Sequence, residues 1–456
     1  MTADGFDVDL LVVGAGMAGM TAAAYAAGHG ASVLVVEKAA EIGGSALLSG
    51  GGLLRPQSAA DLMAINPSGD PKFATMLSED YDGAIEWIAS TGVAVTDVDT
   101  SIPAVMGYPS ALRGFDIGAY IPRCRAIVES AGGHVVPLTD VEELLVADGR
   151  VVGARLRDRD GVSDVRARWT LLATGGFHNN PELRARYLGG NAKTMLVRGN
   201  QVSDGAGLRL ALSVGGTTTP LMNRFYGHTV PWPLDHEFVK ADYVRLAQHY
   251  LSTHSVILDK SGHRIVDESL GYYRNSQAVL ANDDGRALLV GDQRVREADM
   301  AGGAPERTLG YERLDRITEA AKAGGHAIEA PTVEELDELV RPWGYHGVAA
   351  AVAAFNSQLQ SGTELDPPRS RNRDAIDRGP FFAIEIQPAI TNTWGGLQVN
   401  ERMQVVRSDG EPVPGLLATG ADLGGAFHEK YCSGLNLACT SGLRAAKLAL
   451  DGLRQE

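Results

Sequence analysis

A single segment near the start of the chain restricts its fold more than any other feature. Residues 8–13 (VDLLVV) form a short apolar run, which is typical of a parallel strand buried on both faces. The motif G-x-G-x-x-G follows at residues 14–19, and an alanine-rich helical pattern continues it to residue 27. A second apolar run, at residues 32–36, ends at Glu37, 23 residues after the first glycine. This order of strand, glycine loop, helix, strand and acid predicts a βαβ unit that binds a dinucleotide.

Each loop position has a physical role in such a unit. We expect Gly14 to form the tight turn, Gly16 to let the backbone approach a pyrophosphate, and Gly19 to let the helix pack on the strand. The unpaired N–H groups at the helix N-terminus favour the phosphates. Glu37 is expected to bind a ribose hydroxyl. A glycine-rich turn without a ligand is the simpler alternative, but it does not account for the strands and the acid.

A second group of glycines distinguishes between dinucleotides. Gly43, Gly44 and Ser45 follow the βαβ unit, and a Gly-Gly-Gly run occupies residues 50–52. An NAD site needs no second glycine loop here, whereas a flavin embedded along the protein does, because close backbone approach requires glycine. The sequence therefore favours FAD over NAD.

Composition excludes several other classes of protein. The 456-residue chain is long enough for two or three folding units, and its formal net charge of −15 argues against nucleic-acid or anionic membrane partners. Its three cysteines, Cys124, Cys432 and Cys439, form no Cys-x-x-Cys pair, so no disulfide framework, c-type haem or iron–sulfur site is expected. The first residues lack a basic signal region, and no apolar stretch approaches the length of about 18 residues that spans a membrane. We expect a cytoplasmic protein without membrane insertion or a metal site.

Four motifs in order carry a resemblance to a known family. They are the opening VVGAGMAG…VVEKAAEIGGSALLSGG, LLATGG at residues 171–176, SDGAG at 203–207, and GLLATGAD followed by GG at 415–425. Together they resemble the fumarate reductase and succinate dehydrogenase flavoprotein superfamily over residues 8–442. Asp422 stands where that family usually has glutamate. The passages at 197–199, 390–397 and 424–431 look most like the tricarballylate dehydrogenase branch, and YCSG at 431–434 is similar to the ketosteroid dehydrogenases.

The resemblance implies an α/β fold with a Rossmann-like FAD-binding domain in two sequence segments. These segments are 1–222 and 393–456, with an inserted α+β capping domain for the substrate at 223–392. Within the insert, residues 256–258 are strand-like, residues 312–340 have a charged helical pattern, and residues 367–371 (PPRSR) indicate an exposed loop. The last helix is expected at about residues 434–453.

The family pattern also assigns residues to the cofactor. Succinate dehydrogenases carry a flavin-linking histidine at the position of Ser45, so the FAD is expected to be non-covalent here. The residues expected to bind FAD are Gly14, Gly16, Ala18, Gly19, Glu37, Lys38, Gly44, Ser45, Gly50, Gly51, Val141, Ala173, Thr174, Gly175, Asp204, Asp422, Asn436 and Leu437.

Four substrate positions of the fumarate reductases can be compared with this chain. His228 matches the first histidine, whereas Asn392 replaces the second histidine. Leu251 falls where the acid arginine is expected, and Tyr431 replaces the second substrate arginine. Because one position of four is retained, direct reduction of fumarate is not expected.

The remaining residues suit a related flavin reaction. Like the matching tyrosine of ketosteroid dehydrogenases, Tyr431 is expected to donate a hydrogen bond to a substrate carbonyl. His228 is expected to position the substrate or share a proton transfer, with Tyr250 or His254 as the base. Further assignments are Arg198 and Arg224 for a carboxylate, Asn392 and Tyr108 at the substrate, Tyr120 in a segment that contributes to the pocket, Cys432 in packing, and His249 as an exposed helix residue.

Alternatives stay open for these residues and for the function. His228 can be a structural histidine, and either arginine can pair with an acidic neighbour instead of a substrate. The resemblance implies an FAD-dependent dehydrogenase that introduces a C=C bond next to a carbonyl or carboxylate of a small or cyclic molecule by hydride transfer to FAD. The alternatives are an ene-reductase, a non-catalytic flavin redox or carrier protein, and a nicotinamide-dependent dehydrogenase. The electron acceptor or donor is expected to be a quinone, oxygen or a separate protein, because the sequence carries no haem or iron–sulfur motif.

Overall fold

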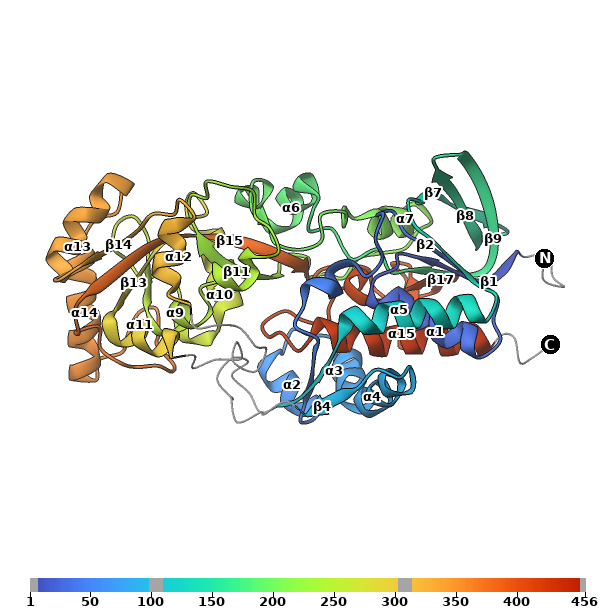
Figure 1. Ribbon diagram of the computed structural model, residues 1–456, viewed down its shortest axis with the longest axis horizontal. Helices are drawn as coiled ribbons and strands as arrows, with labels where there is room; N and C mark the ends of the chain where they lie inside the picture. Colours follow the sequence, from blue (N-terminus) through green and yellow to red (C-terminus); the bar gives the residue numbers. More distant parts are fainter. Residues whose placement is uncertain (1–6, 98–109, 302–313, 452–456) are drawn as a thin grey trace.

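The structure is a computed structural model that describes residues 7–97, 110–301 and 314–451. Two lobes lie end to end, and the described chain begins and ends in the same lobe (Figure 1). We call the lobe with the termini the flavin lobe and the other the cap lobe.

A mostly parallel sheet forms the centre of the flavin lobe, in the order β16-β17-β9-β1-β2-β6. Its central strand β1 places Leu10, Leu11 and Val12 fully out of solvent, as expected of a strand covered on both faces. Strand β16 is antiparallel at one edge, and β7 and β8 extend β9 into an antiparallel meander. The strand bounds are β1 (Val8–Val13), β2 (Val33–Val36), β6 (His134–Val136), β7 (Asp140–Ala147), β8 (Arg150–Asp158), β9 (Gly161–Leu172), β16 (Gln404–Val406) and β17 (Pro412–Ala418).

Three long helices lie alongside one another on this sheet: α1 (Met17–Gly28), α5 (Ile117–Ser130) and α15 (Gly434–Asp451). Helix α1 is rich in alanine because it is buried on nearly all sides. A Cβ atom at Gly442 of α15 would lie 2.6 Å from the carbonyl oxygen of Ala18, so the two helices cross closely only because this residue is glycine. The start and the end of the chain therefore form one packed unit.

A smaller layer completes the flavin lobe below these helices. It contains α2 (Ala59–Ile65), α3 (Pro71–Glu79), α4 (Tyr81–Ser90) and an antiparallel sheet of β3 (Gly52–Pro56), β5 (Ser110–Phe115) and β4 (Val95–Asp97). Helices α6 (Pro181–Leu188) and α7 (Ala206–Ser213) lie on the path from β9 to the cap lobe.

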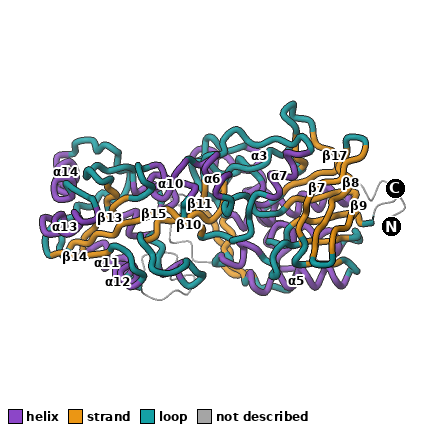
Figure 2. The backbone as a smooth tube through the Cα atoms, turned by 90° about the horizontal axis from the view of Figure 1, so that it is seen from above, coloured by secondary structure: helices purple, strands orange, loops and turns teal. Residues whose placement is uncertain are grey.

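The cap lobe is organised around one long strand, β15 (Phe381–Thr393), which pairs with four other strands. Figure 2 shows these cap strands in one half of the molecule and the β7–β9 meander in the other. The partners are β10 (Leu196–Val197), β11 (Phe225–Pro231), β13 (Ala287–Asp292) and β14 (Ala327–Ala330), and β12 (Val256–Leu258) pairs with β13. Val256 and Leu258 belong to one apolar cluster and Ile257 to another, so side chains alternate between two cores.

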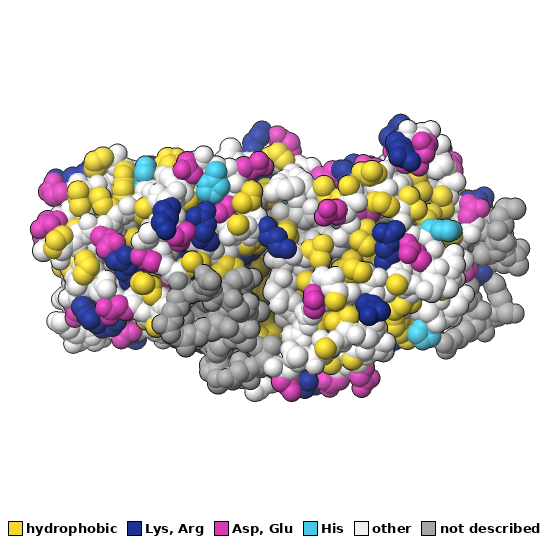
Figure 3. Space-filling model, in the orientation of Figure 1, with side chains coloured by type: hydrophobic (Ala, Val, Ile, Leu, Met, Phe, Trp, Pro, Cys, Tyr) yellow, Lys and Arg dark blue, Asp and Glu magenta, His cyan; other side chains and the backbone are white. Residues whose placement is uncertain are grey.

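Helices cover both faces of the cap sheet. They are α8 (Asp242–Arg245), α9 (His249–His254), α10 (Tyr272–Ala281), α11 (Gln293–Met300), α12 (Arg316–Lys322), α13 (Val333–Val340) and α14 (Val348–Ser361). The face of the molecule in Figure 3 carries acidic and basic side chains interspersed over both lobes. Within the described part of the chain, no helix is long and apolar enough to cross a membrane.

The expected α/β fold, with its Rossmann-like flavin part in two segments, is confirmed. Two local expectations are wrong. Strand β14 interrupts the stretch expected to be helical at 312–340, because its residues pair with the edge of β15. The loop at 367–371 is not simply exposed, since Arg369 is buried in an ion pair. The domain boundaries stay a prediction, and β10 already pairs with the cap sheet before residue 223.

Candidate active site

A cavity of about 780 Å³ extends from the glycine loops of the flavin lobe to the adjoining edge of the cap lobe. This volume lies in the upper part of the range of roughly 300–1,000 Å³ found for small-molecule sites. The predicted cofactor residues that line it are Gly14, Gly16, Ala18, Glu37, Lys38, Gly44, Ser45, Gly50, Val141, Ala173, Thr174, Gly175, Asp204 and Leu437.

The geometry of the first glycine loop fits a bound dinucleotide. Gly14 has φ +106°, and a Cβ there would lie 2.4 Å from the carbonyl oxygen of Ala173. A Cβ at Gly19 would lie 2.0 Å from the carbonyl oxygen of Gly14, so this residue lets α1 pack against the loop. Gly16, the N-cap of α1, has no neighbour closer than 4.0 Å to such a Cβ and lines the cavity. The open space therefore lies at the helix N-terminus, where a pyrophosphate is favoured.

Charged residues line the cavity beside this loop. One carboxylate oxygen of Glu37 accepts the N–H of Ala15 at 2.8 Å, and the other accepts the N–H of Ala39 at 2.8 Å. These bonds hold the acid at the end of β2, the position expected for a ribose contact. Lys38 forms an ion pair with Asp204 at 2.6 Å, and both residues line the cavity.

Four predicted cofactor residues lie behind the cavity wall. Asp422 accepts hydrogen bonds from the N–H and the hydroxyl of Thr174, and Asn436 donates to the carbonyl oxygens of Leu54 and Leu77. A Cβ at Gly51 would lie 2.1 Å from the carbonyl oxygen of Phe115. These residues and Gly19 hold the wall in place and do not line the cavity.

Aromatic side chains line the end of the cavity that borders the cap lobe. The rings of Tyr226 and Tyr431 stack with centroids 4.2 Å apart, and Trp394 lies parallel to Tyr431 at 6.4 Å. The hydroxyls of Tyr226 and Tyr272 share a hydrogen bond of 2.6 Å. Phe427 contacts both Trp394 and Tyr431. This end offers an apolar surface with a few hydroxyl groups.

Tyr431 lies at the N-terminus of α15. Its hydroxyl oxygen accepts the N–H of Gly434, the first residue of that helix, at 2.7 Å. Burial, followed by the neighbouring Tyr226, raises the pKa of Tyr431 above its ordinary value, so the phenol carries its proton. A hydroxyl that accepts one hydrogen bond still has a proton to donate.

His228 and His249 form a hydrogen-bonded pair between their Nδ1 and Nε2 atoms. Burial lowers the pKa of His228 well below its ordinary value, with further lowering by Arg198 and His249, so His228 is neutral. Its Nε2 is buried and has no hydrogen-bond partner among the described residues. The expectation that His249 is simply an exposed helix residue is wrong, because its ring lines the cavity beside His228 and Tyr272.

The two residues expected to supply a base lie outside the cavity. Tyr250 and His254 stack on each other with ring centroids 3.8 Å apart. Residues four apart lie on one face of a helix, so these two share a side of α9 that differs from that of His249. Leu251, at the position expected for the acid arginine of the family, is buried in the cap core.

Only some of the predicted substrate residues line the cavity. Arg198 and Asn392 line the cavity, whereas Arg224 does not. Arg198 donates to the hydroxyl of Thr391 at 3.1 Å and to the carbonyl oxygen of Tyr243 at 3.0 Å, and it lies over the Tyr243 ring. Tyr108 falls outside the described residues. Tyr120 is fully buried, with its hydroxyl bonded to Thr21 and Trp87, and Cys432 is also fully buried.

The sequence interpretation did not assign several of the lining residues to the site, among them Tyr226, Tyr243, His249, Tyr272 and Trp394. The aromatic and histidine-rich character of residues 225–254 was a usable signal for three of them. Tyr272 and Trp394 had no such signal, because only the pairing of β11 with β15 and the packing of α10 bring them to the site. Among the described residues, no group of histidine, cysteine and carboxylate side chains is arranged to hold a metal ion.

A glycine-loop pocket continuous with an aromatic, hydrogen-bonding pocket defines a dinucleotide-dependent oxidoreductase. The family described as "FAD binding domain" matches residues 9–85 and 119–436, and the chain belongs to it. The predicted membership of the fumarate reductase and succinate dehydrogenase flavoprotein superfamily, with FAD as cofactor, is thereby confirmed, and the protein is an FAD-dependent oxidoreductase.

Similarity to individual proteins extends over nearly the whole chain. A fumarate reductase (cytochrome) of Shewanella frigidimarina is 27% identical over 92% of this chain and 72% of its own length. A 3-oxosteroid 1-dehydrogenase of Mycolicibacterium smegmatis is 24% identical over 91% of this chain and 92% of its own length. The 3-ketosteroid delta1-dehydrogenase from Sterolibacterium denitrificans has the same fold, with a TM-score of 0.79, 18% identity, and coverage of 98% of this chain and 99% of that one.

Proposed function

We propose that the protein is a dehydrogenase acting on CH–CH groups, which introduces a C=C bond next to a carbonyl or carboxylate of a small or cyclic substrate. The observation that carries this proposal is the contact between the Tyr431 hydroxyl and the Gly434 N–H at the start of α15. Relatives named as fumarate reductase and 3-oxosteroid 1-dehydrogenase support the general type of reaction.

Tyr431 and the N-terminus of α15 stabilise charge on the substrate oxygen. Removing a proton from the carbon next to a carbonyl moves negative charge to that oxygen, and a fixed donor there lowers the barrier. The phenol of Tyr431 donates to the oxygen, and the helix N-terminus adds a favourable potential. Because the raised pKa keeps the phenol protonated, this donor is present throughout the neutral pH range.

The His228–His249 pair takes the proton. His228 is neutral, and its Nε2 has no hydrogen-bond partner within the described residues. In the tautomer whose Nδ1–H donates to His249, this Nε2 is an acceptor for the proton on the α-carbon. His249, hydrogen-bonded to the other ring nitrogen, orients this imidazole and shares the positive charge that develops. Bound FAD supplies the acceptor for the hydride that leaves the β-carbon. In total the substrate loses a proton from its α-carbon to the histidine pair and a hydride from its β-carbon to the cofactor, and the C=C bond forms between these two carbons.

The other residues hold the substrate and exclude water. Stacked Tyr226, Tyr431 and Trp394 provide flat apolar surfaces for a ring or short chain. Arg198 and Asn392 supply hydrogen-bond donors for a carbonyl or carboxylate. Ser45, in place of a flavin-linking histidine, supports non-covalent attachment of FAD.

The experiment is anaerobic mixing of the purified FAD-bound protein with candidate ketones and, separately, with the matching enones. Only a substrate for dehydrogenation bleaches the oxidised flavin, so reduction by ketones supports the proposal. Turnover of enones by chemically reduced enzyme, without any bleaching by ketones, would indicate an ene-reductase instead. Tyr431→Phe is expected to slow flavin reduction by about 10²–10³-fold, whereas Tyr25→Phe on α1 serves as the control. Release of yellow flavin by acid precipitation tests the non-covalent attachment.

A further inference from the structure

Four cationic side chains lie beside the aromatic end of the cavity, which only one of the four lines, and the reaction proposed above uses none of them. We call Arg224, Arg274, Arg371 and Lys430 the seam cluster. Arg371 lines the cavity. Lys430 directly precedes Tyr431, and Arg274 lies in the first turn of α10, the helix that begins at the cavity residue Tyr272. Arg224 precedes β11, and its carbonyl oxygen accepts the N–H of Trp394 at 3.0 Å.

Three members of the cluster are half-buried, whereas Arg371 is exposed, and the positive charges within the cluster repel one another. The Lys430 ammonium donates to the carbonyl oxygen of Leu270 at 3.3 Å and lies 5.7 Å from the ring centroid of Tyr273. Burial, followed by the positive charges of Arg371 and Arg274, lowers the pKa of Lys430 to about 8. Burial and Arg274 also lower the pKa of Arg224, and the negative charge of Glu429 offsets part of this lowering. Like charges held together at a partly buried site are costly unless an anion compensates them.

The N-terminus of α10 adds to the positive potential. This ten-residue helix starts after Gly271, which provides no side-chain cap. A basic residue in the first turn of a helix is unfavourable by itself, because the helix dipole is already positive there. Arg274 occupies such a position, and a bound anion would offset this unfavourable interaction.

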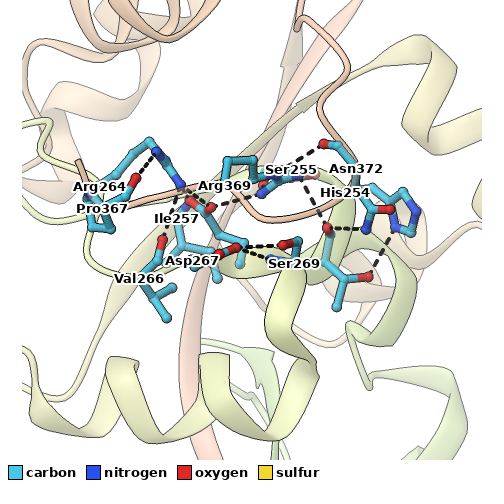
Figure 4. Close-up of polar contacts among 12 residues, drawn as sticks. His254, Ser255, Ile257, Arg264, Val266, Asp267, Ser269, Pro367, Arg369 and Asn372 are labelled. Carbon is cyan, nitrogen blue, oxygen red and sulfur yellow. Dashed lines mark hydrogen bonds and ion pairs between the residues drawn. The ribbon is translucent and has the colours of Figure 1, made fainter. Parts of the chain in front are cut away.

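The nearby carboxylates form ion pairs or hydrogen bonds with other groups. Glu268 pairs with Arg264 and Arg369 at 2.6 and 2.8 Å, and Asp267 accepts two hydroxyls, as Figure 4 shows in part. Glu429 is bonded to His428 and to the N–H of Ser68. Across the described residues, no ion pair joins Arg224, Arg274 or Lys430 to a carboxylate.

A rigid anchor holds Arg371 beside the cavity. The fully buried Arg369 donates to Glu268 and to the carbonyl oxygen of Ser255, which fixes the loop against the cap core (Figure 4). The N–H of Ser370 donates to Asp267 at 2.8 Å, and the N–H of Arg371 donates to Ser269 at 2.9 Å. The backbone at Arg371 is therefore positioned by the fold before any ligand binds.

We propose that the seam cluster binds an anionic group, a carboxylate or a phosphate, which the substrate carries at a distance from the CH–CH bond. This inference rests on the proposed function and narrows its substrate class to anionic carbonyl compounds. Guanidinium groups suit both anions because their N–H pairs match two oxygens at once. The aromatic wall then holds the apolar part between this anion and the carbonyl at Tyr431.

The test measures binding by the absorbance change of FAD in the oxidised holoenzyme, without turnover. The probes are 6-oxoheptanoate, its neutral amide 6-oxoheptanamide, inorganic phosphate and pyrophosphate. We expect the acid to bind more tightly than the amide. Arg274→Ala is expected to weaken binding of the preferred anion by about tenfold or more, while binding of the amide is unchanged. Comparing the acid with the phosphates identifies the preferred anion.

Matched variants separate this effect from misfolding. Arg402→Ala removes an exposed cation that pairs with Asp451, and it is expected to bind all probes as the wild type does. Lys430→Met provides a second test if Arg274→Ala loses FAD. Equal binding of acid and amide, failure of every anion to bind, or unchanged anion binding in both cluster variants would overturn the inference. Failure of the dehydrogenase function appears separately, as no flavin reduction by any ketone, and leaves the binding result standing.

Discussion

Asp422 and Thr174 are joined by two hydrogen bonds although 248 residues separate them. The carboxylate accepts the N–H of Thr174 at 2.5 Å and its hydroxyl at 2.9 Å, and it also accepts the N–H of Gly176 at 2.9 Å. This contact ties the loop after β9 to the loop after β17, so the two sequence segments of the flavin lobe share one cavity wall.

Asp422→Asn is therefore expected to loosen the wall without touching FAD. An amide nitrogen replaces one acceptor oxygen and faces an N–H donor, which costs about 1–3 kcal/mol. We expect a lower Tm of the apoprotein and weaker FAD binding in a titration followed by flavin fluorescence. Asp160→Asn, on an exposed turn, is the matched control. Wild-type Tm and FAD affinity in Asp422→Asn would contradict this role.

Two alanine substitutions in the glycine loop are expected to separate packing from ligand approach. In Gly19→Ala the new Cβ collides with the carbonyl oxygen of Gly14, so the apoprotein should lose about 1–3 kcal/mol of stability. In Gly16→Ala the Cβ meets nothing within 3.9 Å and occupies the cavity, so FAD affinity should fall with a smaller loss of stability. Thermal unfolding of the apoproteins and FAD titration measure the two effects. An equal loss of apoprotein stability in both variants would argue against this division.

His249→Asn tests the histidine pair. Loss of the imidazole leaves His228 without the partner that orients it, so flavin reduction should slow by about 10²-fold or more at unchanged FAD content. Anaerobic stopped-flow absorbance gives the rate. His263→Asn, at an exposed position, controls for loss of a histidine. If His249→Asn reduces its flavin at the wild-type rate while His228→Asn does not, His228 acts alone.

Lys430 should give the protein a distinctive pH dependence. Its pKa is lowered to about 8 in the folded protein, compared with about 10.4 in an unfolded chain. Between these values the unfolded chain holds the proton and the folded chain does not, so the stability contributed by this group rises with pH. Lys430→Met is expected to exceed the wild type in Tm at pH 7, and this advantage should shrink by pH 10. Lys447→Met, on the exposed side of α15, is the control, and a pH-independent advantage of Lys430→Met would refute the shift.

The backbone geometry of the first glycine loop could be predicted from the sequence, because its determinants are local. The roles expected for Gly14 and Gly19 depend on a strand, a turn and a helix that follow one another directly, and their φ angle and close contacts agree with those roles. The residues at the catalytic end of the cavity could be predicted less well from the sequence. Tyr250 and His254 were predicted as candidate bases, but the rotation of α9 about its axis directs His249 to the cavity instead.

The sequence by itself determined the class of fold, the dinucleotide unit and the return of the chain to the flavin lobe, because spacing and glycine positions carry that information along the chain. Only the tertiary structure decided which aromatic rings, histidines and cations surround the substrate end. Those residues come from β11, α9, α10, β15 and the approach to α15, and their meeting depends on strand pairing and helix rotation. Nothing in the local pattern of any one segment specifies those long-range contacts.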